Sequence, residues 1–506
     1  MSQTDIPDRM YRVGRAFVIT LGVALATVQY ALDRSVWYDE AMLSLNIINR
    51  SSRDLLMPLS HYQVAPILFL EIEKFLVTTF GNSELSLRLL PLLCFVGSAF
   101  LFERVSRALS GSRAAALTAL ALFCISPTIL YYSSEIKQYM GDVFVTLLIY
   151  YAVLFKEYRS ERIRTSAAVL IGSVSILFSH IAVIILFTVG ILMLSKNLRR
   201  SSTVPLQKTL LPIAVWLAVF SVNYVTFLSG HPSRNDLVDY WNFAFPPLSP
   251  LHLDFWFWLR RRATMVFGGL LSFPPQFYFY GPFMLVYGVS LAALWRRRAL
   301  TTLYLLVFPV LVHLTLSYLR QYPFDLRLIL YQAPLYILVV VDGCYWISGL
   351  LQRYASWKRS FIVLAIPLVL VSYDLFRQYP LRREEIKPAL SFINKNAMPG
   401  QTIYVYWGSI PAFTFYKEIG YLRVGESVVF GKEHLDNPGA YEKDVDSLQG
   451  VTWVLFSHFY PFDGSHKEEH YIVDRLLRRG RILKKKEAVG ASVYLFNLPA
   501  AKPHSS

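Results

Sequence analysis

The chain has 506 residues, of which 54% are hydrophobic and 17% charged, and its mean hydropathy is +0.40. This composition is too apolar for a soluble multidomain protein and is typical of a polytopic membrane protein. The net charge of +16 does not indicate nucleic-acid binding, because the Lys and Arg clusters lie in short loops between apolar runs, where membrane topology requires them. The cysteines Cys94, Cys124 and Cys344 each lie inside an apolar run and predict neither a disulfide framework nor a metal site.

Apolar runs predict eleven transmembrane helices. The first run follows Arg9 and Arg12 and lacks a small-residue cleavage site, so we expect a retained span with the N-terminus in the cytoplasm. Five strongly basic loops between residues 104 and 359 are then also cytoplasmic, and the C-terminus is extracytoplasmic. The predicted spans are 16–32, 86–104, 114–131, 140–155, 165–179, 181–195, 209–228, 277–295, 299–317, 328–349 and 360–376. This topology predicts a multi-pass protein of the cytoplasmic (inner) membrane.

Two long extracytoplasmic loops follow from this topology, at about 33–85 and 229–276. Within the first loop, residues 64–80 are apolar but contain Glu71, Glu73 and Lys74. Each charge would cost roughly 2.5 to 3.5 kcal/mol at the centre of a spanning helix. We therefore expect this segment to be a helix lying along the membrane surface.

The sequence pattern changes after the last span. Residues 384–396 and 471–479 have helical spacing, residues 402–407 and 451–456 read as buried strands, and residues 491–497 alternate like a strand. We therefore divide the chain into a transmembrane catalytic domain, residues 1–376, and a small extracytoplasmic α/β domain, residues 377–506.

Candidate chemistry begins with Asp39 and Glu40, which follow Trp37 and Tyr38 just after the first predicted span. Adjacent carboxylates on a helix point about 100° apart, so one is expected to react and the other to support it. The alternative is that Asp39 only caps the following helix, with Glu40 in its first turn. Met42 occupies the place of the Glu or Gln of a capping box, which argues against that alternative.

Further ionisable residues are expected at the outer ends of spans, where such groups are functional candidates. Glu135 and Lys137 lie in the turn after the third predicted span, and Arg88 and Arg327 lie near the starts of the second and tenth. The alternatives are a local ion pair for the first two and contact with lipid phosphates for the arginines. His180 lies between two apolar runs, where a histidine is often only a packing residue. Tyr38, Tyr139 and His180 are the candidate substrate-binding residues.

Several motifs together resemble a known family. They are Trp37-Tyr38-Asp39-Glu40-Ala41, Ala65-Pro66, Gly81-Asn82-Ser83-Glu84, Leu87-Arg88-Leu89-Leu90-Pro91, Ser126-Pro127 and Tyr132-Ser133-Ser134-Glu135-Ile136-Lys137-Gln138-Tyr139. This set resembles the GT-C superfamily of glycosyltransferases that use polyprenyl-phosphate sugars. Within it, the set is most similar to family 39, the bacterial proteins grouped with protein O-mannosyltransferases and lipid A aminoarabinose transferases.

The resemblance implies that Asp39 is the catalytic aspartate and that Glu135 belongs to the second acidic turn of the family. Two positions depart from the family pattern. Lys137 stands where an arginine is usual, which replaces a bidentate fork by a point charge. His61-Tyr62-Gln63-Val64-Ala65-Pro66 replaces the usual His-Pro-Pro-Leu, so a role for the histidine is not carried over.

These features predict an inverting membrane glycosyltransferase of cell-envelope glycosylation. Its donor is a polyprenyl-phosphate sugar, and its acceptor is a hydroxyl of an extracytoplasmic lipid, glycan or protein. Because the phosphate is already a good leaving group, the reaction needs one base and cations, without a second acid. We assign the base to Asp39, the orientation of the acceptor or of the base to Glu40 or Glu135, and phosphate binding to Lys137, Arg88 and Arg327.

Other classes stay open at this stage. A lipid-linked sugar flippase or a polysaccharide polymerase would have similar spans without an extracytoplasmic base, and an assembly protein would depend on the tail alone. No cofactor is required by any ligand spacing, although Mg²⁺ or Mn²⁺ suits carboxylates such as Asp39 and Glu135. Membrane lipids are expected partners, and nucleic acid is not.

Overall fold

The computed structural model describes residues 5–199, 204–230, 232, 234–274, 280–352, 362–423, 427–434, 439–460 and 468–499. Contacts divide the chain into two compact units. The helical unit consists of Met1–Leu32, Ser52–Phe75 and Arg88–Leu381. The sheet unit consists of Asp33–Ser51, Leu76–Leu87 and Arg382–Ser506, so it combines the C-terminal region with two short segments from the first 90 residues.

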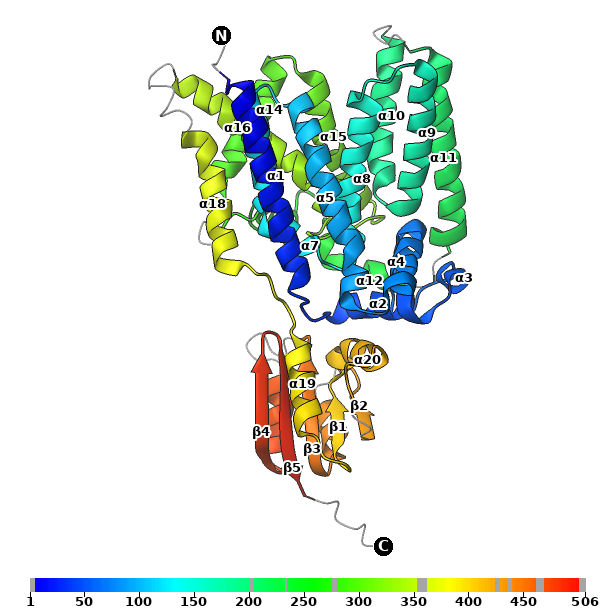
Figure 1. Ribbon diagram of the computed structural model, residues 1–506, viewed down its shortest axis with the longest axis vertical. Coiled ribbons are helices and arrows are strands. Elements are labelled where there is room, and N and C mark those ends of the chain that lie inside the picture. The colour runs from blue at the N-terminus through cyan, green and yellow to red at the C-terminus, as the bar shows by residue number, and fades with distance from the viewer. Residues whose placement is uncertain are drawn as a thin grey trace. The chain divides into compact units, whose positions relative to one another are not determined.

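Long helices that run side by side build the helical unit (Figure 1). Five helices of the described residues are long and apolar enough to cross a membrane. They are Asp8–Ala31 (α1), Glu84–Leu109 (α5), Leu206–Leu228 (α11, Leu206–Asn223, continued by η2, Tyr224–Leu228), Leu300–Tyr318 (α15) and Leu330–Leu351 (η5, Leu330–Gln332, continued by α16, Ala333–Leu351). Each coincides with a predicted span, which confirms a multi-pass membrane architecture.

The remaining predicted spans correspond to shorter helices. These are α6 (Arg113–Ile125), α8 (Tyr139–Ile149) with η1 (Tyr150–Phe155), α9 (Glu161–Phe178), α10 (Ala182–Leu198), α14 (Gly281–Arg296) and α18 (Ile362–Gln378). Residues 277–279, 360 and 361 of two predicted spans lie outside the described residues.

One predicted span is wrong in its extent. Residues 114–131 were expected to form one helix, but α6 ends at Ile125 and a separate helix, α7, covers Pro127–Tyr132. Proline disfavours helical backbone in the residue before it, and Ser126 is extended, with φ −63° and ψ 119°. The Ser126 hydroxyl then accepts from the N–H of Ile129, so it caps the new helix.

Small residues allow the helices of this unit to pack closely. A Cβ on Gly172 of α9 would lie 2.0 Å from the ring nitrogen of Trp216 in α11. That nitrogen donates to the Ala168 carbonyl at 3.0 Å. A Cβ on Gly22 of α1 would lie 2.7 Å from Cys124 of α6. Van der Waals contact between small residues is the main attraction between helices in lipid, where water does not drive their association.

The segments between the spans contain short helices. Residues 33–85 form α2 (Tyr38–Asn49), α3 (Ser52–Leu55) and α4 (Ile67–Phe80), and residues 229–276 form α12 (Arg234–Tyr240), η3 (Asn242–Ala244), α13 (Leu253–Thr264) and η4 (Met265–Leu270). The predicted helix at 64–80 is thus present from Ile67, and its 14 residues are fewer than the roughly 20 needed to span a bilayer. Glu73 of α4 is fully buried, and burial raises its pKa well above the usual range. A neutral Glu73 avoids the cost of a buried charge.

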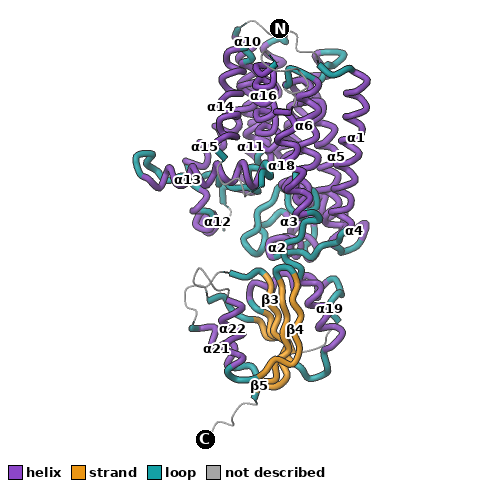
Figure 2. The backbone as a smooth tube through the Cα atoms, turned by 90° about the vertical axis from the view of Figure 1, so that its left-hand side faces the viewer, coloured by secondary structure: helices purple, strands orange, loops and turns teal. Residues whose placement is uncertain are grey.

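The sheet unit contains a five-stranded sheet of order β2-β1-β3-β5-β4. The strands are β1 (Thr402–Val405), β2 (Ser427–Phe430), β3 (Gly450–Ser457), β4 (Arg481–Ala488) and β5 (Ala491–Leu498). β1 pairs in parallel with β2 and β3, whereas β5 pairs antiparallel with β3 and β4. Figure 2 shows α19 (Ile386–Asn396) on one side of the sheet and α21 (Ala440–Asp446) and α22 (Glu468–Leu477) on the other.

The predicted α/β character of the tail is confirmed, and four of its elements were missed. The predicted helices and strands appear as α19, α22, β1, β3 and β5, whereas α20 (Ile410–Glu418), α21, β2 and β4 were not predicted. β4 contains Lys484, Lys485 and Lys486, and its side chains are mostly exposed. Since β4 is at the edge of the sheet, its lysines discourage pairing with other chains, and the strand lacks the apolar pattern that predicts buried strands.

A buried carboxylate organises one face of this sheet. Glu468 is 1% exposed and accepts hydrogen bonds from the hydroxyls of Tyr406 and Tyr441 and from the indole N–H of Trp407. Burial, reinforced by this carboxylate, raises the pKa of both tyrosines above the usual range, so both hydroxyls stay protonated as donors. These hydrogen bonds connect the residues directly after β1 to α21 and α22.

We expect Glu468→Leu to destabilise the sheet unit by about 2 to 6 kcal/mol, because two buried hydroxyls lose their acceptor at roughly 1 to 3 kcal/mol each. The measurement is hydrogen exchange of the β3 amides in the full-length protein in detergent. Glu468→Gln keeps an acceptor oxygen and should lose less. Equal protection in Glu468→Leu and wild type would contradict this assignment.

Candidate functional site

Asp39 and Glu40 occupy different environments at the start of α2. The helix begins at Tyr38, with Trp37 in the N-cap position, so Asp39 is the second helical residue and not the cap. Asp39 is partly exposed, whereas Glu40 is 0% exposed. Acidic residues in a first turn are favoured by the helix dipole. The accessible carboxylate is therefore that of Asp39.

Glu40 is held by a buried ion pair. The two terminal nitrogens of Arg34 donate to the two carboxylate oxygens of Glu40, each at 2.9 Å. The backbone N–H of Trp37 also donates to Glu40, at 3.3 Å. The bidentate geometry fixes the direction of the carboxylate as well as its charge. Glu40 thus joins the segment before α2 to its first turn.

Tyr38 packs within the sheet unit. Its ring stacks on His458 at 4.3 Å between centroids and meets Trp407 edge-on at 6.2 Å. His458 follows the end of β3 with a left-handed backbone, φ 55°. These contacts place the residue before Asp39 against the end of a central strand.

Glu135 and Lys137 lie in the turn between α7 and α8 of the helical unit, and Tyr139 follows at the start of α8. Glu135 is 1% exposed and Lys137 is 5% exposed. The Lys137 ammonium donates to the side-chain oxygen of Gln63 at 2.5 Å. Tyr139 opens α8 and meets Tyr132 edge-on at 5.6 Å. A cation that is held away from water interacts more strongly with an anionic ligand than an exposed one does.

Gln63 and His180 line one cavity of about 170 Å³ in the helical unit. Its other lining is largely apolar, from residues 55–70 and 225–230, with Asn223 as a further polar side chain. Within the described residues, neither ring nitrogen of His180 has a hydrogen-bond partner. Burial lowers the pKa of His180 to about 4, so the ring is neutral and presents one donor and one acceptor.

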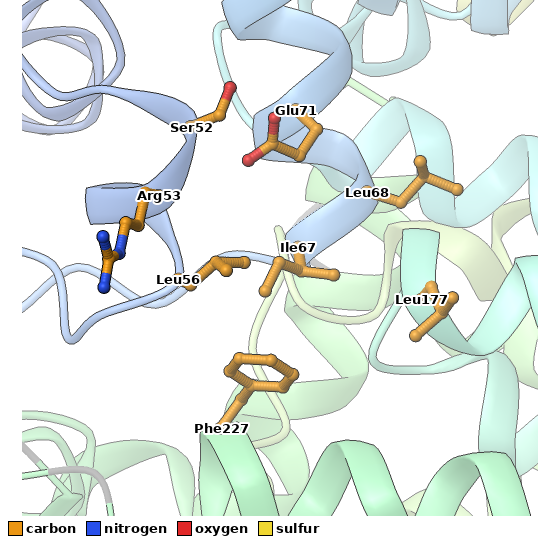
Figure 3. Close-up of a pocket in the computed structure, with 8 residues that line it drawn as sticks. All are labelled: Ser52, Arg53, Leu56, Ile67, Leu68, Glu71, Leu177 and Phe227. Atoms are coloured by element: carbon orange, nitrogen blue, oxygen red, sulfur yellow. The ribbon is translucent and has the colours of Figure 1, made fainter.

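A second, more open pocket of about 460 Å³ adjoins this cavity and shares Leu56, Ile67 and Phe227 with it. Figure 3 shows these apolar side chains around the space, with the carboxylate of Glu71 on the side of Ser52. Arg53, Leu68 and Leu177 complete the lining. Both hollows therefore open among α3, α4 and the ends of α9 and η2.

The two candidate arginines have different surroundings. Arg88 lies in the second turn of α5 and is 0% exposed. Arg327 is partly exposed, with its guanidinium 4.8 Å from the ring centroid of Trp241. Arg262 donates to Asp325 at 2.7 Å and to the carbonyls of Phe324 and Phe243, which holds the segment of Arg327 against α13 and η3.

The candidate residues are divided between the two units. Glu135, Lys137, Tyr139, His180, Arg88 and Arg327 belong to the helical unit, and Tyr38, Asp39 and Glu40 belong to the sheet unit. The sequence did not single out Gln63 as a partner of Lys137, or His458 as a partner of Tyr38. Both pairs are remote in sequence, and no periodicity or motif signals them. No group of three or more His, Cys, Asp or Glu residues suited to a metal ion occurs among the described residues.

Comparison with known proteins gives a structural likeness only. No protein-family model and no curated protein matches this chain. Among solved structures, ArnT from Cupriavidus metallidurans bound to undecaprenyl phosphate matches with a TM-score of 0.51 and 10% identity, over 95% of this chain and 97% of that one. The apo structure of the same protein matches with a TM-score of 0.49 and 12% identity, over 94% and 97%. The fold of this chain is therefore similar to that of ArnT, and the match covers 95% of this chain.

Proposed function

We propose that this protein is an integral-membrane inverting glycosyltransferase that moves a sugar from a polyprenyl-phosphate donor to a hydroxyl of an extracytoplasmic acceptor. The observation that carries the proposal is the division of roles at the start of α2. Glu40 is buried and paired with Arg34, whereas the neighbouring Asp39 is accessible. The family resemblance of this motif implies that Asp39 is the catalytic aspartate, and an accessible carboxylate suits a base.

In the proposed reaction, the acceptor oxygen attacks the anomeric carbon of the donor sugar while its proton passes to the carboxylate of Asp39. The bond between the anomeric carbon and the phosphate oxygen breaks, and polyprenyl phosphate leaves with the electron pair. Attack from the side opposite the leaving group inverts the anomeric centre. Only one protein base is needed, since phosphate leaves without protonation.

Lys137, Arg88 and Arg327 are assigned to the donor phosphate in this proposal. Two of these cations, Lys137 and Arg88, are almost fully buried in the helical unit, where a phosphate would compensate their loss of hydration. The matched ArnT structure contains undecaprenyl phosphate, which supports a polyprenyl phosphate as the lipid. We place residues 1–376 in the catalytic membrane domain and the region 377–506 on the extracytoplasmic side of the cytoplasmic membrane. Glu135, Tyr38, Tyr139 and His180 are the proposed acceptor and sugar contacts.

We expect Asp39→Asn to reduce turnover by about 10²- to 10⁴-fold, because the amide cannot accept the acceptor proton. The purified full-length protein is given polyprenyl-phosphate sugars singly with a cell-envelope lipid extract, and release of polyprenyl phosphate is followed. Glu157→Gln, which removes an exposed charge between η1 and α9, is the control and should turn over normally.

Full turnover by a folded Asp39→Asn enzyme would exclude Asp39 as the base. A lipid-linked sugar flippase would move the donor across vesicles without releasing polyprenyl phosphate and would tolerate Asp39→Asn. That outcome would replace the transferase proposal.

We expect Lys137→Gln to weaken the binding of undecaprenyl phosphate by about 10- to 100-fold, since a hydrogen bond to a charged group contributes roughly 1.5 to 3 kcal/mol. The affinity is measured from the rise of the unfolding temperature with ligand concentration. Lys137→Arg keeps the charge and should bind within a few-fold of wild type. Arg199→Gln, at the exposed end of α10, is the matched control, and equal affinity in Lys137→Gln would remove this residue from the phosphate site.

A further inference from the structure

We propose that side chains of the C-terminal region position the base, because they bond the backbone of the segment immediately before Asp39. This inference rests on the proposed function, in which Asp39 accepts the proton. The segment, residues 33–37, has no regular secondary structure. Buried amides need hydrogen-bond acceptors, and the C-terminal region supplies acceptors for the amides of Ser35, Val36 and Tyr38.

The first acceptor is Glu385. Its carboxylate accepts from the backbone N–H of Ser35 at 3.2 Å and from the Ser35 hydroxyl at 3.0 Å. The same hydroxyl accepts from the backbone N–H of Lys387 at 3.0 Å. Ser35 is 1% exposed and Glu385 is 8% exposed, so water does not replace these bonds. The start of α19 and the segment before Asp39 are thus joined by three hydrogen bonds at one serine.

The second acceptor is Tyr416 of α20. Its hydroxyl accepts from the backbone N–H of Val36 at 2.8 Å and donates to Glu84 at 2.9 Å. Lys387 also pairs with Glu84, at 2.9 Å, and bonds both the carbonyl and the carboxylate of Asp33. Tyr416 is fully buried, and its hydroxyl is therefore oriented by two partners at once.

The third acceptor is Glu384, which lies next to Glu385. One of its carboxylate oxygens accepts from the backbone N–H of Tyr38 at 3.4 Å, and the other contacts Nδ1 of His458 at 2.9 Å. His458 in turn stacks on the Tyr38 ring. The guanidinium of Arg383 lies 3.5 Å from the ring centroid of Trp37, so the residues on both sides of this amide are also held through their side chains.

These contacts fix the backbone up to the residue before Asp39. A base works only if its oxygen is within hydrogen-bond reach of the acceptor hydroxyl, and a displacement of about 1 Å can lower a rate by about 10²-fold. Glu384, Glu385 and Tyr416 are therefore positioning residues that act through Asp39. They need not touch substrate, so they are expected to affect kcat and to leave the donor KM unchanged.

The test uses the purified full-length enzyme and the polyprenyl-phosphate release assay. Tyr416→Phe removes one hydroxyl and keeps the ring, and Glu385→Leu removes the acceptor of Ser35. Each should lower kcat by about 10- to 100-fold with less than a twofold change in the donor KM. Glu385→Gln keeps an acceptor oxygen and should retain kcat within about threefold. Tyr421→Phe is the control, since this exposed ring packs 5.3 Å from Tyr416.

Combination with Asp39→Asn separates positioning from a general structural role. If the tail residues act through Asp39, Tyr416→Phe should cause no further fall in the residual rate of Asp39→Asn. An equal fall in both backgrounds would overturn the inference. Hydrogen exchange of the β1 amides reports folding. Ser35→Ala, which removes the hydroxyl that bonds Glu385 and Lys387, replaces any variant that loses this protection.

The two proposals fail in different ways. A large loss in Asp39→Asn with unchanged kcat in Tyr416→Phe, Glu385→Leu and Ser35→Ala would overturn the positioning inference and leave the transferase intact. Normal turnover in Asp39→Asn would overturn the base assignment and the inference that rests on it.

Discussion

The buried pair of Arg34 and Glu40 is the interaction on which the candidate base depends. Removing either partner would leave a charge in a site that water does not reach, at a cost of several kcal/mol. The pair also bonds the amide of Trp37, so the direction in which α2 leaves the preceding segment is fixed by the same contact. Asp39 directly precedes Glu40. Its carboxylate is accessible, whereas the carboxylate of Glu40 is buried.

Around this pair, the sheet unit is built from parts that are far apart in sequence. Glu84, Glu385 and Tyr416 come from three separate regions, and their side chains meet around residues 33–36. The C-terminal region therefore forms part of the frame of the candidate site and does not merely follow the membrane helices.

Some buried polar groups of the helical unit are paired with one another. His313 of α15 contacts the Tyr331 hydroxyl through Nδ1 at 2.9 Å and the Pro323 carbonyl through Nε2 at 3.0 Å. Because a carbonyl only accepts, Nε2 carries the proton. This network holds the loop that leads to Arg327. The burial of a polar side chain within membrane-spanning helices costs free energy unless the side chain is paired. The pairing of His313 also keeps the neighbouring backbone in place.

The sequence by itself determined the class of the protein, because runs of apolar residues must match the bilayer thickness and basic loops must fit its topology. It also determined the candidate carboxylates and cations, since Asp39, Glu135 and Lys137 belong to recognisable motifs at the ends of helices. The edge strand β4, with its lysines, and the break of the helix at Ser126 were not predicted, because local charge and a single proline outweighed the hydrophobic pattern there.

Only the tertiary structure decided which carboxylate is buried and which is accessible, and which residues hold them. Glu385 and Ser35 are 350 positions apart, and Lys137 and Gln63 are 74 apart. Such pairs leave no signal in the sequence. Hydrophobic periodicity indicates which face of one helix or strand is buried, but not which distant residue that face contacts. The difference in burial between Asp39 and Glu40 is a property of the folded chain and cannot be read from two adjacent acidic residues.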